Sequence, residues 1–167
     1  CDVAQIIRET VPLVGGGRSV RIDIHTEPGL SAARADASRI GQVLQNLVIN
    51  GIQAMKGGGR MEIIARNAVI SQGDAKLAPG RYVEVIVRDR GPGMSPELAS
   101  RLFGESVTTK ASGNGVGLIS CKRIIDEHGG DIRVSSLLGT GTEFTFFLPS
   151  THQAPANAKS CGPNSLI

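Results

Sequence analysis

The chain has 167 residues, a net charge of +3 and 40% hydrophobic residues, which suits one domain with a packed core and excludes a chain that is disordered as a whole. Aromatic residues make up only 3% and include no Trp, so stacking platforms for single-stranded nucleic acid are nearly absent. The basic residues never form a run, which indicates solubility and no nucleic-acid partner. Three cysteines at spacings that match no zinc site favour a reducing, cytoplasmic compartment. No apolar stretch approaches the roughly twenty residues that span a bilayer, so we expect no membrane contact by this chain.

The N-terminal third predicts two helices around one strand. Residues 2–14 predict a short helix that is broken near Pro12 and ended by glycines, and RIDIH at 21–25 alternates as a strand. Asp36 is suited to cap a long helix over 36–55, in which apolar residues recur at helical spacing.

The remainder predicts two strand pairs around a second long helix. RMEIIARNAVI at 60–70 and YVEVIVRD at 82–89 predict adjacent strands joined by a polar loop. VGLISCKRIIDEH at 116–128 predicts a helix closed by two glycines. The segments 131–137 and 142–149 predict a final strand pair around a glycine turn. We therefore expect one domain over 1–149, followed by a flexible tail or linker over 150–167.

The helix over 36–55 carries a stripe of amide side chains beside its apolar face. Gln42, Asn46, Asn50 and Gln53 recur at spacings of three or four residues. Neutral amides suit a partly enclosed site, where they orient a ligand or give an oxygen to a hard cation. The alternative is a polar helix face that lacks charge by chance.

The strand at 82–89 ends in the motif DRGPGM. Asp89 stands at the strand terminus, and Gly91 and Gly93 allow a tight turn with close backbone approach to a ligand, beside Met94. A carboxylate in this place can accept a hydrogen bond from an exocyclic amine. A plain Asp-Gly turn is the competing interpretation.

A third element, TTKASGNGVGL, combines a lysine with glycines that lead into the helix at 116–128. Free backbone amides, a positive helix end and a lysine together predict a phosphate site, although a loop without a ligand is the alternative. The spacing fits neither the P-loop nor the Rossmann pattern. The residues concerned are Thr108, Thr109, Lys110, Gly113, Gly115, Val116, Gly117 and Leu118.

In order and spacing, the three elements resemble the nucleotide-binding boxes of the GHKL ATP-binding superfamily, and most closely the catalytic domain of two-component sensor histidine kinases. QVLQNLVINGIQAM is similar to the N box, DRGPG to the first glycine box, RLFGESVTTK to the F box and GNGVGL to the second glycine box. HGGDIRVSSLLGTGTEFTFFLP is similar to the closing strands. The resemblance covers residues 2–149.

The resemblance implies an α+β fold, a two-layer α/β sandwich in which three main helices cover one face of a mixed sheet. ATP would lie between the helix layer and a lid at 104–114. Asp89 would accept the adenine amine near Thr142, and the Asn50 side-chain oxygen would be the Mg2+ ligand, with Asn46 one turn earlier near the phosphates. The catalytic residues implied are Asn46, Asn50 and Lys110. The other implied ATP-binding residues are Gln53, Gly91, Gly93, Met94, Thr108, Thr109, Gly113, Gly115, Val116, Gly117 and Leu118.

The chain also departs from the family pattern. Gly51 replaces the usual alanine, which weakens the helix by about 1 kcal/mol. Gln53 stands where a basic residue is common, Arg90 replaces a common asparagine, and 104–107 lacks the proline and aromatic pair of the F box. We expect nucleotide binding to survive, with altered lid packing.

The resemblance implies phosphoryl transfer from MgATP to a histidine. Hydrolysis is disfavoured because Asn46 occupies the place of the glutamate that activates water in the related ATPases, and an amide cannot act as a general base. The alternatives are a nucleotide-binding module without transfer activity, and an ATPase or serine kinase of the same superfamily.

None of the three histidines begins the family's acceptor pattern, and His128 is suited to place a favourable charge at a helix end. The chain begins with Cys, so we expect a piece of a longer protein, with the acceptor on a dimerisation domain before Cys1. A response regulator receiver domain would be an indirect partner.

Overall fold

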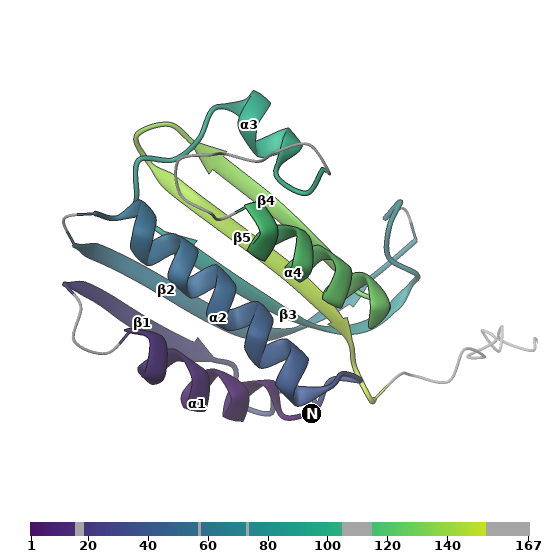
Figure 1. The fold of residues 1–167 in the computed structure, drawn as a ribbon. Coiled ribbons are helices and arrows are strands. Elements are labelled where there is room, and N and C mark those ends of the chain that lie inside the picture. Colours follow the sequence, from purple (N-terminus) through teal and green to yellow (C-terminus); the bar gives the residue numbers. More distant parts are fainter. Residues whose placement is uncertain (16–18, 57, 73, 105–114, 153–167) are drawn as a thin grey trace, which may run out of the picture.

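A computed structural model describes residues 1–15, 19–56, 58–72, 74–104 and 115–152. The elements are α1 (Val3–Gly15), β1 (Val20–Thr26), α2 (Ala37–Ala54), β2 (Gly59–Ile70), β3 (Gly80–Asp89), α3 (Pro96–Arg101), α4 (Gly115–Glu127), β4 (Asp131–Leu137) and β5 (Gly141–Pro149). Within the described residues, the strands form one five-stranded sheet in the order β1-β2-β3-β5-β4. β1 is parallel to β2, and every other neighbouring pair is antiparallel. Because α1, α2 and α4 cover the same face of this mixed sheet, the predicted two-layer α+β fold is confirmed (Figure 1).

The first helix differs from its prediction. α1 continues through Pro12 to Gly15, so the predicted break is wrong. Proline removes one helical hydrogen bond to the carbonyl four residues earlier, but Pro12 is exposed and that carbonyl can bond to water. On the opposite side of the helix, Val3, Ile7 and Val11 are buried. Their packing holds α1 together where the local sequence favours a break.

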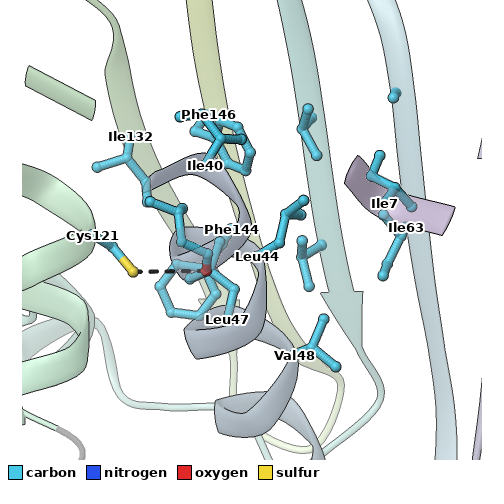
Figure 2. Close-up of a cluster of buried hydrophobic side chains, with 14 of the residues drawn as sticks. Ile7, Ile40, Leu44, Leu47, Val48, Ile63, Cys121, Ile132, Phe144 and Phe146 are labelled. Carbon is cyan, nitrogen blue, oxygen red and sulfur yellow. Dashed lines mark hydrogen bonds between the residues drawn. The ribbon is translucent and has the colours of Figure 1, made fainter. Parts of the chain in front are cut away.

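The central helix and the core agree with the prediction. The Asp36 side chain accepts a hydrogen bond from the backbone N–H of Arg39 at 2.9 Å and caps α2. Cys121 is a core residue, as predicted: its Sγ lies 3.8 Å from the Val43 carbonyl oxygen, and burial raises the pKa of its thiol to about 11 (Figure 2). The core around it includes Ile7, Ile40, Leu44, Leu47, Val48, Ile63, Ile132, Phe144 and Phe146.

The sequence analysis missed the short helix α3. Its signals are nevertheless local: Ser95 caps the helix through a 3.3 Å hydrogen bond from the Leu98 N–H, with Pro96 in the first turn. Phe103, just beyond this helix, packs edge-on against Phe144 with the ring centroids 6.3 Å apart. The segment between the two glycine boxes therefore has its own attachment to the core.

His128 joins the end of α4 to the start of α2. The backbone N–H of Asp36 donates to His128 Nε2 at 3.2 Å, and His128 Nδ1 lies 2.7 Å from the Ile124 carbonyl oxygen. One ring nitrogen therefore contacts the start of α2 and the other contacts the last turn of α4. The favourable charge expected at this helix end stays a prediction.

The face of the sheet that carries no helix has a group of charged side chains near the Asp89 end of β3. Arg88 pairs with Glu62 at 3.1 Å and with Glu143 at 2.7 Å, which links β2, β3 and β5. Toward the other end, the loop between β2 and β3 folds over a small apolar cluster of Leu77, Tyr82 and Phe147. This face therefore combines cross-strand ion pairs with a small apolar cluster.

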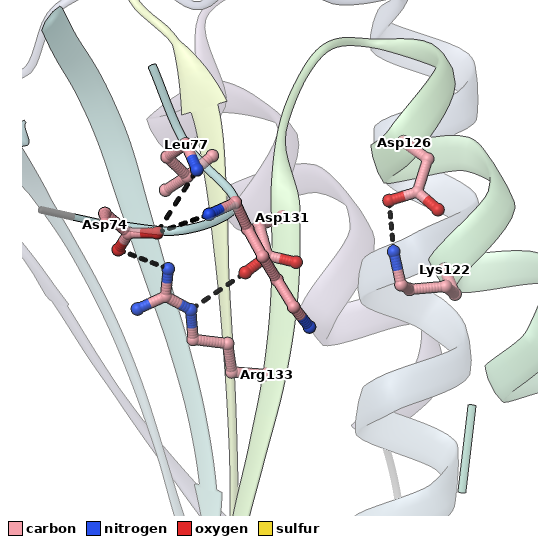
Figure 3. A network of polar contacts seen from close by, with 7 residues as sticks. Asp74, Leu77, Lys122, Asp126, Asp131 and Arg133 are labelled. Atoms are coloured by element: carbon pink, nitrogen blue, oxygen red, sulfur yellow. Dashed lines mark hydrogen bonds and ion pairs between the residues drawn. The ribbon is translucent and has the colours of Figure 1, made fainter. Parts of the chain in front are cut away.

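Ion pairs also hold that loop. Arg133 Nη2 lies 2.6 Å from Asp74 Oδ2 and Arg133 Nε lies 2.8 Å from Asp131 Oδ2 (Figure 3). The hydrogen bond from Arg133 lowers the pKa of Asp74 to about 2. The guanidinium also lies 5.0 Å from the centre of the Phe147 ring. Arg133 therefore joins the loop to both β4 and β5.

The sheet continues slightly beyond the predicted domain boundary at 149. The Ser150 N–H donates to the Arg81 carbonyl at 2.9 Å, and the Thr151 N–H donates to the Ala32 carbonyl at 2.9 Å. The rest of the predicted tail, 153–167, lies outside the described residues. None of the helices in the described part of the chain has both the length and the apolar character needed to cross a bilayer.

Candidate functional site

A short polar row interrupts the otherwise apolar covered face of the sheet. Asp89 of β3 pairs with Thr142 of β5, which pairs in turn with Ser136 of β4. The next two rows along these strands, toward the middle of the sheet, are Val87–Phe144–Val134 and Val85–Phe146–Ile132. Polar side chains replace apolar ones at the same end of three neighbouring strands. A ligand at this end of the covered face would therefore meet hydrogen-bonding groups next to the core.

Asp89 is the charged member of this row and is only 5% exposed. Its Oδ1 accepts a hydrogen bond from the Gly91 N–H at 2.9 Å, and the backbone N–H of Thr142 also donates to the carboxylate. Burial raises the pKa of Asp89, and these two hydrogen bonds oppose that rise. The side chain is therefore a buried and oriented acceptor, and its contact with adenine stays a prediction.

The glycines after Asp89 bring the chain close to its neighbours. A Cβ on Gly91 would lie 2.9 Å from Asp89 Oδ1, and a Cβ on Gly93 would lie 2.0 Å from the Leu137 carbonyl oxygen. Gly93 also has a φ of 70°, which side chains rarely adopt. The Gly139 N–H donates to the Pro92 carbonyl at 2.7 Å. These contacts seat the glycine turn on the β4–β5 hairpin, and a plain surface turn would not need them.

Ser136 connects the turn to the polar row, and the sequence analysis missed it. Its Oγ accepts a hydrogen bond from the Met94 N–H at 2.8 Å and lies 2.8 Å from Thr142 Oγ1 and 3.0 Å from the Gly141 carbonyl oxygen. The available signal was the alternation of β4, in which Ile132, Val134 and Ser136 share the covered face. A polar residue in an inward position of a strand is a candidate for a site.

α2 lies above this row at Gly51. A Cβ there would lie 2.3 Å from Met61 Cε and 3.5 Å from Asp89 Oδ2. The Met61 methyl group therefore fills the space that the family's usual alanine would occupy. Asn50, the neighbouring residue on α2, is half-buried. The missing side chain at Gly51 thus leaves room for the Met61 side chain of the strand below.

Asn46 lies against the start of α4. Its Nδ2 lies 3.5 Å from the Gly117 carbonyl oxygen, at the upper limit for a hydrogen bond, and a Cβ on Gly117 would lie 3.6 Å from Asn46 Cγ. Leu118, the next residue on α4, is buried in the core. The structure therefore brings the predicted N box and the end of the second glycine box together.

The amide stripe does not act as one unit. Gln42 is exposed and lines a groove with Leu13 of α1, while Gln53 is exposed and lines another groove with Ser19. Only Asn46 and Asn50 of the stripe are half-buried. The expected contact of Gln53 with a phosphate remains a prediction.

Several predicted site residues cannot be placed in the structure. Thr108, Thr109, Lys110 and Gly113 lie outside the described residues, as does the predicted lid after Gly104. Gly115 is the first residue of α4 and Val116 is the second. The roles of these residues stay predictions.

The described residues hold no group of three or more His, Cys, Asp or Glu side chains arranged for a metal ion. A cage of carboxylates for a divalent cation is therefore absent from this part of the chain. Mg2+ commonly takes one or two protein oxygens together with substrate phosphates and waters. The amide oxygen of Asn50 fits that donor set, since it is a hard oxygen on a half-buried side chain.

The sequence matches the family model described as histidine kinase-, DNA gyrase B- and HSP90-like ATPase over residues 35–152. It is 34% identical over 155 residues to the sensor histidine kinase ZraS of Klebsiella oxytoca, covering 91% of this chain and 31% of that protein. It is 37% identical over 151 residues to the signal transduction histidine-protein kinase AtoS of Escherichia coli strain K12, covering 89% and 23%. The chain thus spans about a quarter to a third of these relatives.

Solved structures of histidine kinases are similar to this chain over most of its length. The catalytic domain of the histidine kinase ThkA has a TM-score of 0.73 at 31% identity, covering 90% of this chain and 93% of that one. Full-length ShkA in complex with AMPPNP has a TM-score of 0.70 at 28% identity, covering 93% and 32%. The match to ThkA extends over nearly all of both chains, so it concerns the whole domain. The chain therefore belongs to the family of histidine kinase-, DNA gyrase B- and HSP90-like ATPases, as an ATP-binding catalytic domain of the sensor histidine kinase type.

Proposed function

We propose that this domain binds MgATP and donates the γ-phosphoryl group to a histidine on a separate dimerisation domain of the same protein. The observation that carries the proposal is the row of Asp89, Thr142 and Ser136 at the end of an apolar sheet face, with the glycine turn seated beside it. A response regulator receiver domain would take the phosphoryl group from that histidine. The names of the relatives support these partners, since ZraS and AtoS are histidine kinases.

Recognition of adenine is assigned to Asp89. The Gly91 and Thr142 N–H groups hold the carboxylate in place, and its remaining lone pairs can accept the exocyclic amine of the base. The neighbouring apolar rows of β3 and β5 suit the faces of a purine ring. A base with a carbonyl oxygen in place of the amine would meet an acceptor.

Binding of the triphosphate is assigned to the start of α4 and to the segment before it. Gly115 and Gly117 lie in the first turn of α4, where free backbone N–H groups and the helix dipole favour an anion. Lys110, Thr108, Thr109 and Gly113 would add a charge, hydroxyl groups and a further backbone amide. Asn50 would hold Mg2+, which when bound neutralises charge on the phosphates and orients them.

Transfer is favoured over hydrolysis by the side chain at position 46. The Asn46 amide has no basic group to take a proton from water, and its nitrogen is directed to the Gly117 carbonyl oxygen. Phosphoryl transfer relies mainly on positioning and charge neutralisation, which amides and backbone donors can supply.

The binding part is tested by calorimetric titration of the chain with ATP, with and without Mg2+. Asp89→Asn removes a charge-assisted hydrogen bond worth about 1.5 to 3 kcal/mol, so ATP affinity should fall by about 10- to 150-fold. Glu84→Gln is the matched control. Glu84 lies on the same strand as Asp89, but it forms an ion pair with Arg66 on the open face of the sheet, which no helix covers. Unchanged ATP affinity in Asp89→Asn would remove Asp89 from the adenine site.

The transfer part is tested by mixing the ATP-loaded chain with the histidine-bearing domain of the full-length protein. Acid-labile phosphate on that domain is the expected product. Binding without transfer would instead indicate a nucleotide-binding signalling module. Acid-stable phosphoprotein would indicate a serine kinase, and steady phosphate release would indicate an ATPase.

A further inference from the structure

The hydroxyl group of Ser136 has three hydrogen-bonding neighbours, and together they determine where its proton lies. The Met94 N–H can only donate, and the Gly141 carbonyl oxygen can only accept. Thr142 Oγ1, at 2.8 Å, can do either. A hydroxyl group has one proton and two lone pairs. All three contacts are therefore satisfied only if Ser136 donates to Gly141 and accepts from both Met94 and Thr142.

This arrangement determines to which group the Thr142 hydroxyl donates its hydrogen bond. Because Thr142 donates its only hydroxyl proton to Ser136, its Oγ1 can only accept hydrogen bonds from other groups. Thr142 is 7% exposed and is the cross-strand neighbour of Asp89, whose carboxylate is also an acceptor. The two side chains therefore present adjacent acceptors and no donor.

Two adjacent acceptors discriminate between purines. Adenine carries an amine at position 6, which donates hydrogen bonds, whereas hypoxanthine and guanine carry a carbonyl oxygen there, which accepts them. A site whose polar groups are left unpaired by the wrong base rejects that base strongly. A Thr142 hydroxyl group that is free to rotate could donate to the carbonyl oxygen and weaken this rejection.

We propose that Ser136 is a positioning residue that holds Thr142 as a hydrogen-bond acceptor and thereby increases the preference of the site for 6-amino over 6-oxo purine nucleotides. This inference rests on the proposed function, because it assumes that the base lies at Asp89. Ser136 itself acts through Thr142. The same hydroxyl group also fixes the glycine turn at Met94, so its loss should weaken binding of both nucleotides to some degree.

The test is the ratio of ITP to ATP dissociation constants, measured by calorimetry on the whole chain with Mg2+. ITP carries a carbonyl oxygen at position 6 and a proton on N1, and it lacks the 2-amino group of GTP. Ser136→Ala should lower this ratio by about tenfold, the equivalent of one hydrogen bond. Ser136→Thr keeps the hydroxyl group and should keep the parental ratio. Ser135→Ala is the matched control, because Ser135 is the adjacent residue of β4 and faces the open side of the sheet.

A pair of variants separates positioning from a structural role. In a Thr142→Val background the hydroxyl group is gone, so adding Ser136→Ala should change the ratio no further. If Ser136→Ala lowers both affinities equally and leaves the ratio unchanged, Ser136 is structural and the inference is wrong. If Ser136→Ala does not fold, Ser136→Cys replaces it, since a thiol is a poor donor and acceptor; a parental ratio in that variant also overturns the inference.

Nucleotide binding by the parent protein distinguishes a failure of this inference from a failure of the proposed function. A parent that binds ATP and ITP equally contradicts the positioning role but leaves nucleotide binding intact. A parent that binds neither nucleotide contradicts the proposed function itself.

Discussion

The two faces of the sheet are built from the same strands but hold together in different ways. The face covered by α1, α2 and α4 (Figure 1) packs around the apolar core of Figure 2 and has the row of Asp89, Thr142 and Ser136 at one end of its strands. The open face, which no helix covers, is crossed by ion pairs such as those of Arg88. A polar residue is ordinary on the open face, because water and a neighbouring charge satisfy it. On the covered face a polar residue loses its contact with water, which costs free energy unless a partner replaces the water. Three such residues in one row therefore indicate a site. A polar residue therefore indicates a functional site more strongly on the covered face of the sheet than on the open face.

The largest effect should come from the covered face. Phe144→Ala removes a side chain that is only 2% exposed and contacts Phe103, and should lower the free energy of unfolding by about 3 to 5 kcal/mol. Urea unfolding followed by circular dichroism measures this loss. A change below about 1 kcal/mol would mean that the core collapses around the cavity.

The second prediction concerns the polar end of that face. Asn50→Ala should barely change the melting temperature without ligand but should remove most of the stabilisation by MgATP, about 2.7 kcal/mol at a hundred times the dissociation constant. Gln45→Ala is the control, because Gln45 is an exposed amide on the same helix. A variant that melts much earlier without ligand, yet gains as much from MgATP as the parent, would make Asn50 structural and exclude it as the metal ligand.

The third prediction concerns the contact between α2 and this face. Gly51→Ala improves helix propensity by about 1 kcal/mol but pushes its Cβ against the buried Met61 methyl group, and overpacking costs about 1 to 3 kcal/mol. We expect a net loss of about 1 kcal/mol. In a Met61→Val background the same substitution should become stabilising, so the two substitutions should not be additive. Additive effects in chemical denaturation would show that Met61 does not fill this space.

The fourth prediction turns to the open face. Arg88→Gln breaks ion pairs with Glu62 and Glu143, but the Arg88 side chain is 43% exposed and the loss should be at most about 1 kcal/mol. The difference from the parent should shrink in 1 M salt, where surface charges are screened. A loss as large as that of Phe144→Ala would remove the contrast between the two faces.

The last and smallest effect is a dependence on pH. Burial raises the pKa of Asp89 above its unfolded value of 3.8, while hydrogen bonds from Gly91 and Thr142 oppose the rise. The protonated carboxyl group thus favours folding below pH 3.8, and this contribution is lost as the pH rises through the folded pKa. Without nucleotide, Asp89→Asn should therefore gain stability relative to the parent as the pH rises through that window. Melting curves over the window measure it, and a difference that stays flat or falls with pH would show that the pKa is not raised.

The sequence alone located most of the helices and strands and marked Asp89 and the glycines after it as candidates for the site. Alternation and helical spacing located the strands and the long helices, and Asp36, Asp89 and the glycines after it were recognisable because caps and tight turns depend on local chemistry. The same local reasoning could have found α3 from Ser95 and Pro96.

Only the tertiary structure decided which of these residues meet. The row of Asp89, Thr142 and Ser136 exists because β5 lies between β3 and β4, and strand order follows from how the whole sheet packs. His128 contacts the backbone of Asp36, which is 92 residues away in the sequence. α1 continues through Pro12 because the burial of its apolar side outweighs one lost hydrogen bond. The conformational preference of a local sequence is weak compared with packing. Contacts between distant segments therefore account for the predictions that were wrong, and they determine which residues meet at the centre of the site.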